Sequence, residues 1–256
     1  MAKLQIYQFN CRGDNFGVLI HDAQSGQCAS IDAPMEGAVL TALEKTGWKL
    51  SHILITHWHL DHVEGVEALK KKLGCQVIGP ALERGKIQHM DKAVNDGDEF
   101  SFGSDRVRVI LTPGHTLGMV NFHFVDTGAV FTGDTLFSLG CGRVFEGDGP
   151  MMWNSLQKLA TLPAETAVYC GHEYTLANGN FALSVDPDNK KLQVRMDEVI
   201  ALREAGKPTL PTTIGDELAT NPFLRVGDKN IRKLLGMEGA SDSEVFTEIR
   251  ARKDNF

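Results

Sequence analysis

Residues 56–62, Thr-His-Trp-His-Leu-Asp-His, place three imidazoles and one carboxylate within a single short segment. Histidine and aspartate are both good ligands for zinc-like cations. The apolar run 53–55 before this segment predicts a short buried strand, and apolar residues at helical spacing after it predict a helix ending at Gly74. The segment therefore marks the end of a strand and the start of a helix, where open α/β sheets usually bind ligands.

Three further ligand candidates lie later in the chain, each after an apolar, strand-like run and each directly preceded by glycine: His115, Asp134 and His172. Glycine at these positions allows the backbone to turn sharply into a site. The complete set is His57, His59, Asp61, His62, His115, Asp134 and His172. Seven ligands exceed the needs of one zinc ion and suit two metal ions that share a carboxylate. A chance cluster of solvated histidines would not be expected to have such partners.

Composition excludes several classes of protein. The chain has 256 residues and a net charge of −7, which argues against a general nucleic-acid binder. No apolar run approaches the length of a membrane span, and residues 1–10 lack a signal-peptide pattern, so no membrane association is expected. Five cysteines without paired spacing predict a reducing, cytoplasmic setting. The absence of a G-x-S-x-G elbow gives no support to a serine hydrolase.

The pattern of elements changes along the chain. Short strands are predicted within 3–32 and alternating strands within 106–132, with helices over 36–46 and 152–160. His123 is out of phase with the apolar face of its strand, so we expect it at the surface. After residue 174 strand signals disappear, and Ser241-x-x-Glu244 predicts the capping box of a last helix. We therefore predict a catalytic domain, 1–174, and a helical substrate-binding domain, 175–256.

The order H-x-H-x-D-H, a lone histidine after Thr-Pro-Gly, Gly-Asp-Thr and a late Gly-His resembles the metallo-β-lactamase superfamily. Within it, the chain is similar to hydroxyacylglutathione hydrolase (glyoxalase II) at 140–143, 171–175, 221–223 and the ending R-x-x-K-D-x-F. The resemblance implies an α/β fold, an αββα sandwich of two sheets with helices outside, followed by a C-terminal helical domain. We expect one metal ion on His57, His59 and His115, a second on Asp61, His62 and His172, and Asp134 as the bridge.

Two adjacent cations would acidify a shared water and polarise a carbonyl group, which suits acyl transfer to water. A thiol with a pKa of about 8.5 leaves as thiolate and needs little help from an acid. The resemblance implies a thioesterase that converts S-(2-hydroxyacyl)glutathione, chiefly S-lactoylglutathione, to glutathione and D-lactate in methylglyoxal detoxification. It assigns catalysis to Asp61 and Asp134 with a metal-bridging hydroxide. Zinc is the expected metal, with iron and manganese as alternatives. We expect the protein to be a monomer.

The resemblance also implies the residues that bind glutathione: Arg143, Phe145, Tyr174, Arg250 and Lys253. Two positions depart from the family pattern. Glu64 stands where the family often has glycine, and Phe145 stands where the family has tyrosine, so one hydrogen bond to substrate is expected to be missing. The alternative functions are a lactonase, a β-lactamase, a mononuclear-iron persulfide dioxygenase using first-site ligands, a nuclease, and a protein with a purely structural metal.

Overall fold

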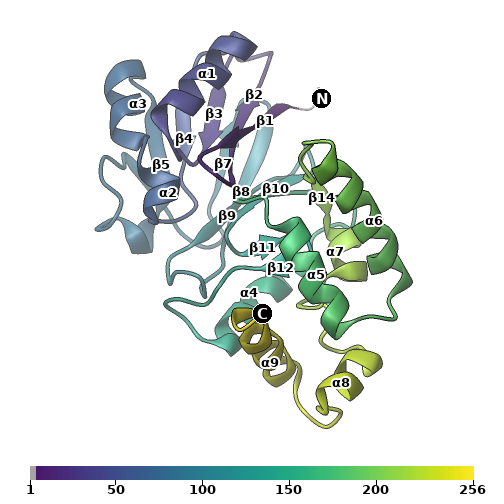
Figure 1. The fold of residues 1–256 in the computed structure, drawn as a ribbon. Helices are drawn as coiled ribbons and strands as arrows, with labels where there is room; N and C mark the ends of the chain where they lie inside the picture. The colour runs from purple at the N-terminus through teal and green to yellow at the C-terminus, as the bar shows by residue number, and fades with distance from the viewer. Residues whose placement is uncertain (1–3) are drawn as a thin grey trace. The chain divides into compact units, whose positions relative to one another are not determined.

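The computed structural model describes residues 4–256, and the chain divides into two compact units. The first unit contains the chain up to Leu111 together with Thr116–Gly133, and the second contains Thr112–His115 and Asp134–Phe256. Figure 1 traces the elements of each unit along the chain. Four of the metal-ligand candidates fall in the first unit, and the other three fall in the second.

The first unit contains a six-stranded mixed sheet in which the strands follow their order in the chain. Its strands are β1 (Gln5–Cys11), β2 (Asn15–His21), β3 (Cys28–Ile31), β4 (His52–Leu54), β5 (Gln76–Pro80) and β6 (Lys92–Val94). The pairs from β1 to β3 are antiparallel, and those from β3 to β6 are parallel. Parallel neighbours need crossover connections. The crossovers carry α1 (Glu36–Thr46), α2 (Leu60–Val63), α3 (Val66–Leu73) and the 3₁₀ turn η1 (Ala81–Glu83).

The helix expected after the histidine segment is divided into α2 and α3. Gly65 lies between them and packs closely against the chain before α1: a Cβ atom there would stand 2.8 Å from Glu36 N and 3.0 Å from Ala33 O. The glycine N–H also donates to Ala33 O. This close backbone approach separates the short ligand-bearing helix from the longer helix, which ends at Gly74 as predicted.

An antiparallel group of strands completes the first unit: β7 (Glu99–Phe102), β8 (Asp105–Leu111), β9 (Val120–Phe124) and β10 (Ala129–Gly133). The predicted alternation is confirmed in β8, where Val107 and Val109 are buried and the arginines beside them are exposed. The expectation for His123 is wrong, because only 7% of this residue is exposed. All five residues of β9 are buried, so both faces of that strand are covered and the alternation of the sequence no longer reports exposure.

The second unit is mainly helical. Its elements are β11 (Leu136–Phe137), β12 (Gly140–Cys141), α4 (Gly149–Ala160), β13 (Ala167–Cys170), α5 (Thr175–Val185), α6 (Lys190–Glu204), β14 (Thr212–Thr213), α7 (Ile214–Thr220), α8 (Lys229–Leu235) and α9 (Asp242–Asp254). The predicted capping box at Ser241 and Glu244 opens α9. The expectation that no strand follows residue 174 is wrong, because the two-residue strand β14 pairs with β13.

All five cysteines are free and buried. Burial raises the pKa of Cys28 and of Cys170 to about 12 and that of Cys141 to about 11, so each thiol is held in its protonated form at neutral pH. Among residues 4–256, none of the helices combines the length and apolar character needed to span a bilayer.

Candidate metal centre and substrate-binding residues

The four candidates of the first unit converge on one another just after β4. His57 Nε2 lies 3.1 Å from His59 Nδ1, and the rings of His57 and His62 have centroids 4.0 Å apart. Asp61 Oδ2 is 3.6 Å from His62 Nε2. His57 and His62 are buried, whereas the side chain of Asp61 is 34% exposed. The segment therefore directs four ligand groups toward a common region from a strand end and the first turn of α2.

Asp32 holds this segment in place. Its carboxylate accepts hydrogen bonds from Thr56 N at 2.7 Å, from Thr56 Oγ1 at 2.9 Å and from His62 Nδ1 at 2.7 Å. Because Nδ1 of His62 donates to Asp32, its Nε2 is left to bind a metal. Sequence reasoning assigned Asp32 no role. The available signal was its position directly after β3, the strand that pairs in parallel with β4.

Two weaker contacts orient the other ligands of this set. His57 Nδ1 lies 3.0 Å from Thr56 Oγ1, which already donates to Asp32 and so accepts from the imidazole. Asn15 Nδ2 donates to Asp61 Oδ2 at 3.0 Å. Hydrogen bonds with Asp32, Thr56 and Asn15 therefore set the orientation of three ligand side chains, those of His62, His57 and Asp61.

The three candidates of the second unit meet at Asp134. Its Oδ2 atom lies 3.5 Å from His115 Nε2 and 3.3 Å from His172 Nε2, and all three side chains are buried. His115 Nδ1 donates to Arg143 O at 2.9 Å, which again leaves Nε2 for a metal. Gly142 makes this approach sterically feasible, because a Cβ atom at that position would lie 1.9 Å from Asp134 O.

The donor set fits divalent metal ions. Imidazole nitrogen and carboxylate oxygen are the ordinary donors for zinc, and they also suit iron and manganese. The Nδ1 atoms of His57, His62 and His115 are each engaged by an oxygen atom of the chain, which fixes the Nε2 atom of each ring as the ligand. Cys141 is not part of either set: its Sγ atom lies 3.8 Å from Arg250 Nη1.

Aromatic rings cover two of the ligand histidines in the second unit. Tyr174 stacks on His172, and Phe145 lies against His115 with the ring centroids 5.2 Å apart. Phe145 is 62% exposed, so one face of its ring is open to solvent. Both residues were expected at the substrate site, and each of them packs on a metal-ligand candidate.

The three basic residues expected to bind glutathione differ in their surroundings. The side chain of Arg143 is 64% exposed, with its Nε 3.7 Å from Asp254 Oδ1. Lys253 Nζ lies 5.5 Å from the ring centroids of Phe181 and Phe256. Burial, reinforced by the charges of Arg250 and Arg143, lowers the pKa of Lys253 below its ordinary value. Arg143 thus offers an exposed positive charge, whereas the ammonium group of Lys253 is partly buried.

Arg250, in contrast, is only 7% exposed. Its Nη1 donates to Cys141 O and its Nη2 to Asp254 Oδ1, both at 2.9 Å, and its guanidinium lies 5.2 Å from the Phe223 ring. Both terminal nitrogens of its guanidinium therefore donate to groups of the chain itself. The departure at Glu64 has a partner as well, because this carboxylate forms an ion pair with Arg12.

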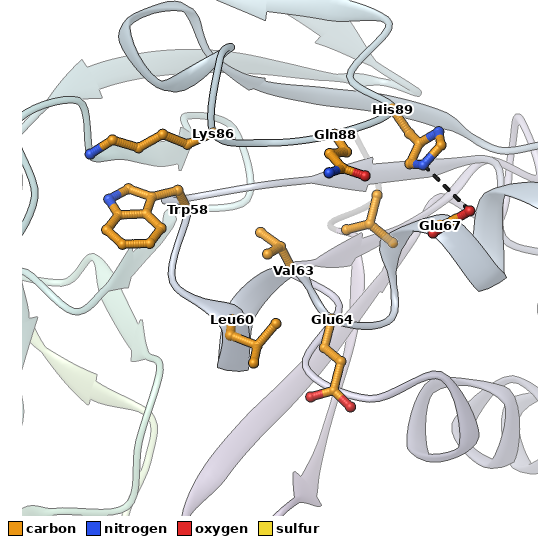
Figure 2. Close-up of a pocket in the computed structure, with 9 residues that line it drawn as sticks. Trp58, Leu60, Val63, Glu64, Glu67, Lys86, Gln88 and His89 are labelled. Atoms are coloured by element: carbon orange, nitrogen blue, oxygen red, sulfur yellow. Dashed lines mark ion pairs between the residues drawn. The ribbon is translucent and has the colours of Figure 1, made fainter.

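A separate open pocket of about 370 Å³ lies beside the histidine segment in the first unit, and Figure 2 shows the residues that line it. Trp58 and Leu60, which alternate with His57, His59 and Asp61 along the chain, both contribute to it. Lys86 Nζ lies 4.5 Å from the Trp58 ring centroid, a cation–π contact, and His89 lies 3.7 Å from Glu67. None of the seven ligand candidates is among its lining residues.

Comparison with known proteins decides the family. The model of the metallo-beta-lactamase superfamily matches residues 22–172, and that of the hydroxyacylglutathione hydrolase C-terminus matches residues 173–256. The hydroxyacylglutathione hydrolase of Brucella anthropi is 58% identical over 254 residues, covering 99% of this chain and 98% of the relative. That of Mesorhizobium japonicum is 56% identical over 253 residues, 99% of each chain. The chain belongs to the hydroxyacylglutathione hydrolase family.

Comparison with solved structures supports the metallo-β-lactamase fold of this member of the hydroxyacylglutathione hydrolase family. ETHE1 from Myxococcus xanthus aligns with a TM-score of 0.66 at 26% identity over 97% of this chain and 98% of that one. The BLEG-1 B3 metallo-beta-lactamase aligns with a TM-score of 0.67 at 21% identity over 86% of this chain and 99% of that one. The predicted fold class and family are thus confirmed, including a helical C-terminal part like that of hydroxyacylglutathione hydrolases.

Proposed function

We propose that this protein is a metal-dependent thioesterase that hydrolyses S-(2-hydroxyacyl)glutathione, with S-lactoylglutathione as its main substrate. The products are glutathione and a 2-hydroxy acid, D-lactate, as methylglyoxal detoxification requires. The similarity to hydroxyacylglutathione hydrolases along the whole chain carries this proposal. A lactonase or persulfide dioxygenase would not be expected to match the C-terminal family model of those hydrolases over residues 173–256.

We propose that the two ligand sets together hold two divalent ions. His57, His59 and His115 would bind the first, Asp61, His62 and His172 the second, and Asp134 both. The number of ligands supports two ions, because one zinc ion uses about four protein or water ligands. Zinc is the expected metal, with iron and manganese as the alternatives. When bound, the pair would acidify a water molecule and polarise the thioester carbonyl.

The chain's own contribution is orientation. Asp134 lies between two histidines, and Asp61 has one oxygen fixed by Asn15, so both proposed catalytic carboxylates have constrained directions. A fixed direction lowers the reorganisation needed when charge develops on the reacting carbonyl oxygen. The leaving thiolate needs little protonation, so the mechanism requires no additional acid from the chain.

For substrate recognition we propose a division into a catalytic domain, 1–174, and a helical substrate-binding domain, 175–256. Glutathione carries two carboxylates, and the exposed Arg143 and partly buried Lys253 are suited to pair with its glycine end. Tyr174 and Phe145 would form the aromatic wall beside it. Arg250 would support this site through its bonds to Cys141 O and Asp254.

The decisive experiment compares three substrates with the zinc-loaded protein: S-lactoylglutathione, a β-lactam and an acyl lactone. Release of glutathione can be followed with a thiol reagent, because all five cysteines of the protein are buried. We expect rapid hydrolysis of the thioester alone. Turnover of the lactone or the β-lactam without thioester hydrolysis would contradict the proposal. We also propose that the protein is a monomer, since one chain supplies every proposed metal ligand, and light scattering at assay concentration tests this. The five free cysteines support the proposal that it is cytoplasmic.

A further inference from the structure

A short hairpin connects the metal-ligand candidate Asp134 to the exposed Arg143. It consists of β11 and β12 joined through Ser138 and Leu139, and Leu139 has a positive φ of 58°. Figure 1 shows both strands beside α5. A two-stranded hairpin of this size has little stability of its own, and a leucine in the left-handed region adds strain. Its conformation must therefore be imposed by its surroundings.

Side chains from the helices bind the polar backbone groups of this hairpin. Asn221 Nδ2 donates to Phe137 O at 3.2 Å and to Gly140 O at 2.9 Å. Asn178 Nδ2 donates to Ser138 O at 3.2 Å, and Arg250 Nη1 donates to Cys141 O at 2.9 Å. Four carbonyl groups of the hairpin therefore accept hydrogen bonds from side chains of α5, of α9 and of the residue that ends α7. They belong to Phe137, Ser138, Gly140 and Cys141.

Glu217 completes this arrangement from the α7 side. Its carboxyl group is buried, with 1% of the residue exposed, and accepts from Leu139 N at 2.8 Å. It also accepts from Thr212 Oγ1 at 2.8 Å and from Asn221 Nδ2 at 2.9 Å. Burying a carboxyl group is costly unless it is well hydrogen-bonded. Here its hydrogen bonds hold the backbone of the strained Leu139 and the side-chain amide of Asn221. That amide in turn binds the carbonyl groups of Phe137 and Gly140, on either side of the turn.

The hairpin in turn determines the placement of the residues directly after it. Gly142 N donates to Thr135 O at 3.1 Å, which closes the hairpin directly beside Asp134. The next residue, Arg143, offers the carbonyl that accepts from His115 Nδ1. A shift of the hairpin would therefore move the group that orients His115, and with it the side chains of Arg143 and Phe145.

We propose that Glu217 and Asn221 are positioning residues, which act through the 136–141 hairpin to set the orientation of His115 and of Arg143. The expected effect on kcat and KM rests on the proposed function, whereas the expected effect on zinc affinity and on the orientation of His115 does not. The C-terminal helices then do more than bind substrate: they hold part of the metal centre in its working geometry.

The test uses the full-length zinc-loaded protein and the variants Glu217→Gln and Asn221→Ser. Three quantities are measured: zinc affinity by chelator competition, the hydrogen-exchange rate of the His115 Nδ1 proton by NMR, and kcat and KM for S-lactoylglutathione. We expect zinc affinity to fall by about 10- to 100-fold, as for loss of groups that orient metal ligands. We expect faster exchange at His115 and a kcat at least about tenfold lower, since tenfold corresponds to only about 1.4 kcal/mol.

Two controls separate positioning from general destabilisation. Glu198→Gln makes the same chemical change at a residue of α6 whose side chain is 60% exposed, and Ile231→Val loosens a fully buried position in α8. Both should keep normal zinc affinity and His115 exchange. Folded Glu217→Gln and Asn221→Ser proteins with normal zinc affinity and exchange would overturn the inference, as would equal losses in Ile231→Val.

Should the first two variants fail to fold, Asn178→Ala removes the amide that donates to Ser138 O and packs against Gly140, and it supplies the same test. A smaller but measurable fall in zinc affinity supports the inference, and an unchanged affinity and exchange rate overturn it. The zinc and NMR measurements need no thioester. If the wild-type protein fails to hydrolyse glutathione thioesters, the proposed function is lost while these two measurements still decide the positioning role.

Discussion

The phenol ring of Tyr174 lies flat on the imidazole of His172, with the ring centroids 4.7 Å apart and an interplanar angle of 3°. The ring of Phe137 is nearly perpendicular to both, with its centroid 5.4 Å from that of Tyr174 and 6.1 Å from that of His172. Stacking of this kind restricts the plane of the imidazole. Tyr174 therefore has two separable features, a ring that steadies a ligand and a hydroxyl group proposed to contact substrate.

Substitutions at Tyr174 should separate these features. Tyr174→Phe keeps the stacked ring, so we expect normal zinc content and a KM for S-lactoylglutathione raised about fivefold, the effect of losing one hydrogen bond of about 1 kcal/mol. Tyr174→Ala should in addition weaken zinc binding, measured by chelator competition. An unchanged KM for Tyr174→Phe would show that the hydroxyl group does not touch substrate.

Asp134 should be indispensable to the metal pair. Metal analysis of the wild-type protein at saturation should give two ions per chain, and Asp134→Asn should lower that number and abolish detectable turnover. The reason is that Asn replaces a charged oxygen shared by two ligand histidines. Asp197→Asn, at an exposed position of α6, is the matched control. One ion per wild-type chain would contradict the binuclear proposal.

Asp32 should matter without touching the metal. Asp32→Asn removes the charge that fixes His62 Nδ1 and weakens the bonds to Thr56, so we expect zinc affinity to fall by about 10- to 100-fold. Circular dichroism should show a folded protein. Thr56→Val, which cuts only the hydroxyl contacts, should give a smaller loss; equal zinc affinity in all three proteins would exclude this orienting role.

Lys253 should give KM a dependence on pH. Because burial and the charges of Arg250 and Arg143 lower its pKa, and Asp254 opposes them only in part, it loses its proton at a lower pH than an ordinary lysine. We expect KM to rise as pH increases through that lowered pKa. Lys253→Met should raise KM roughly ten- to a hundredfold near neutral pH with little change in kcat, the pattern of lost uniform binding.

The control for this prediction is Lys191→Met, at an exposed position of α6. As pH increases, the contribution of Lys253 to the free energy of unfolding should grow while substrate binding weakens. The unfolded chain binds more protons at this residue than the folded chain between the lowered pKa and the ordinary value of 10.5, so its contribution to the free energy of unfolding increases with pH across that window. A KM profile identical in wild-type protein and Lys253→Met would remove this lysine from the site.

Phe145→Tyr should improve substrate binding. The ring of Phe145 packs on His115 and is largely exposed, so a hydroxyl group can be added without crowding. A new hydrogen bond of about 1 kcal/mol would lower KM about fivefold. Phe145→Leu, which removes the ring, should not show this gain. An unchanged KM in Phe145→Tyr would indicate that substrate lies beyond reach of this position.

Much of this molecule could be predicted from its sequence because the relevant signals are local. The ligand candidates come directly after apolar runs, and the capping box of α9 is contained within four residues. The role of Asp32 could not be predicted in the same way, since it depends on the parallel pairing of β3 with β4, which brings together residues 24 positions apart. Burial of Arg250 likewise depends on a contact with Cys141, 109 residues away.

The buried cysteines have a consequence for an enzyme of the proposed kind. Every turnover would release a molecule of glutathione, and glutathione disulfide can exchange with an accessible protein thiolate to leave a mixed disulfide. Here all five thiols are enclosed, and burial keeps the pKa values of Cys28, Cys141 and Cys170 at about 11 to 12. These thiols are thereby shielded from the disulfide that forms when the released glutathione is oxidised.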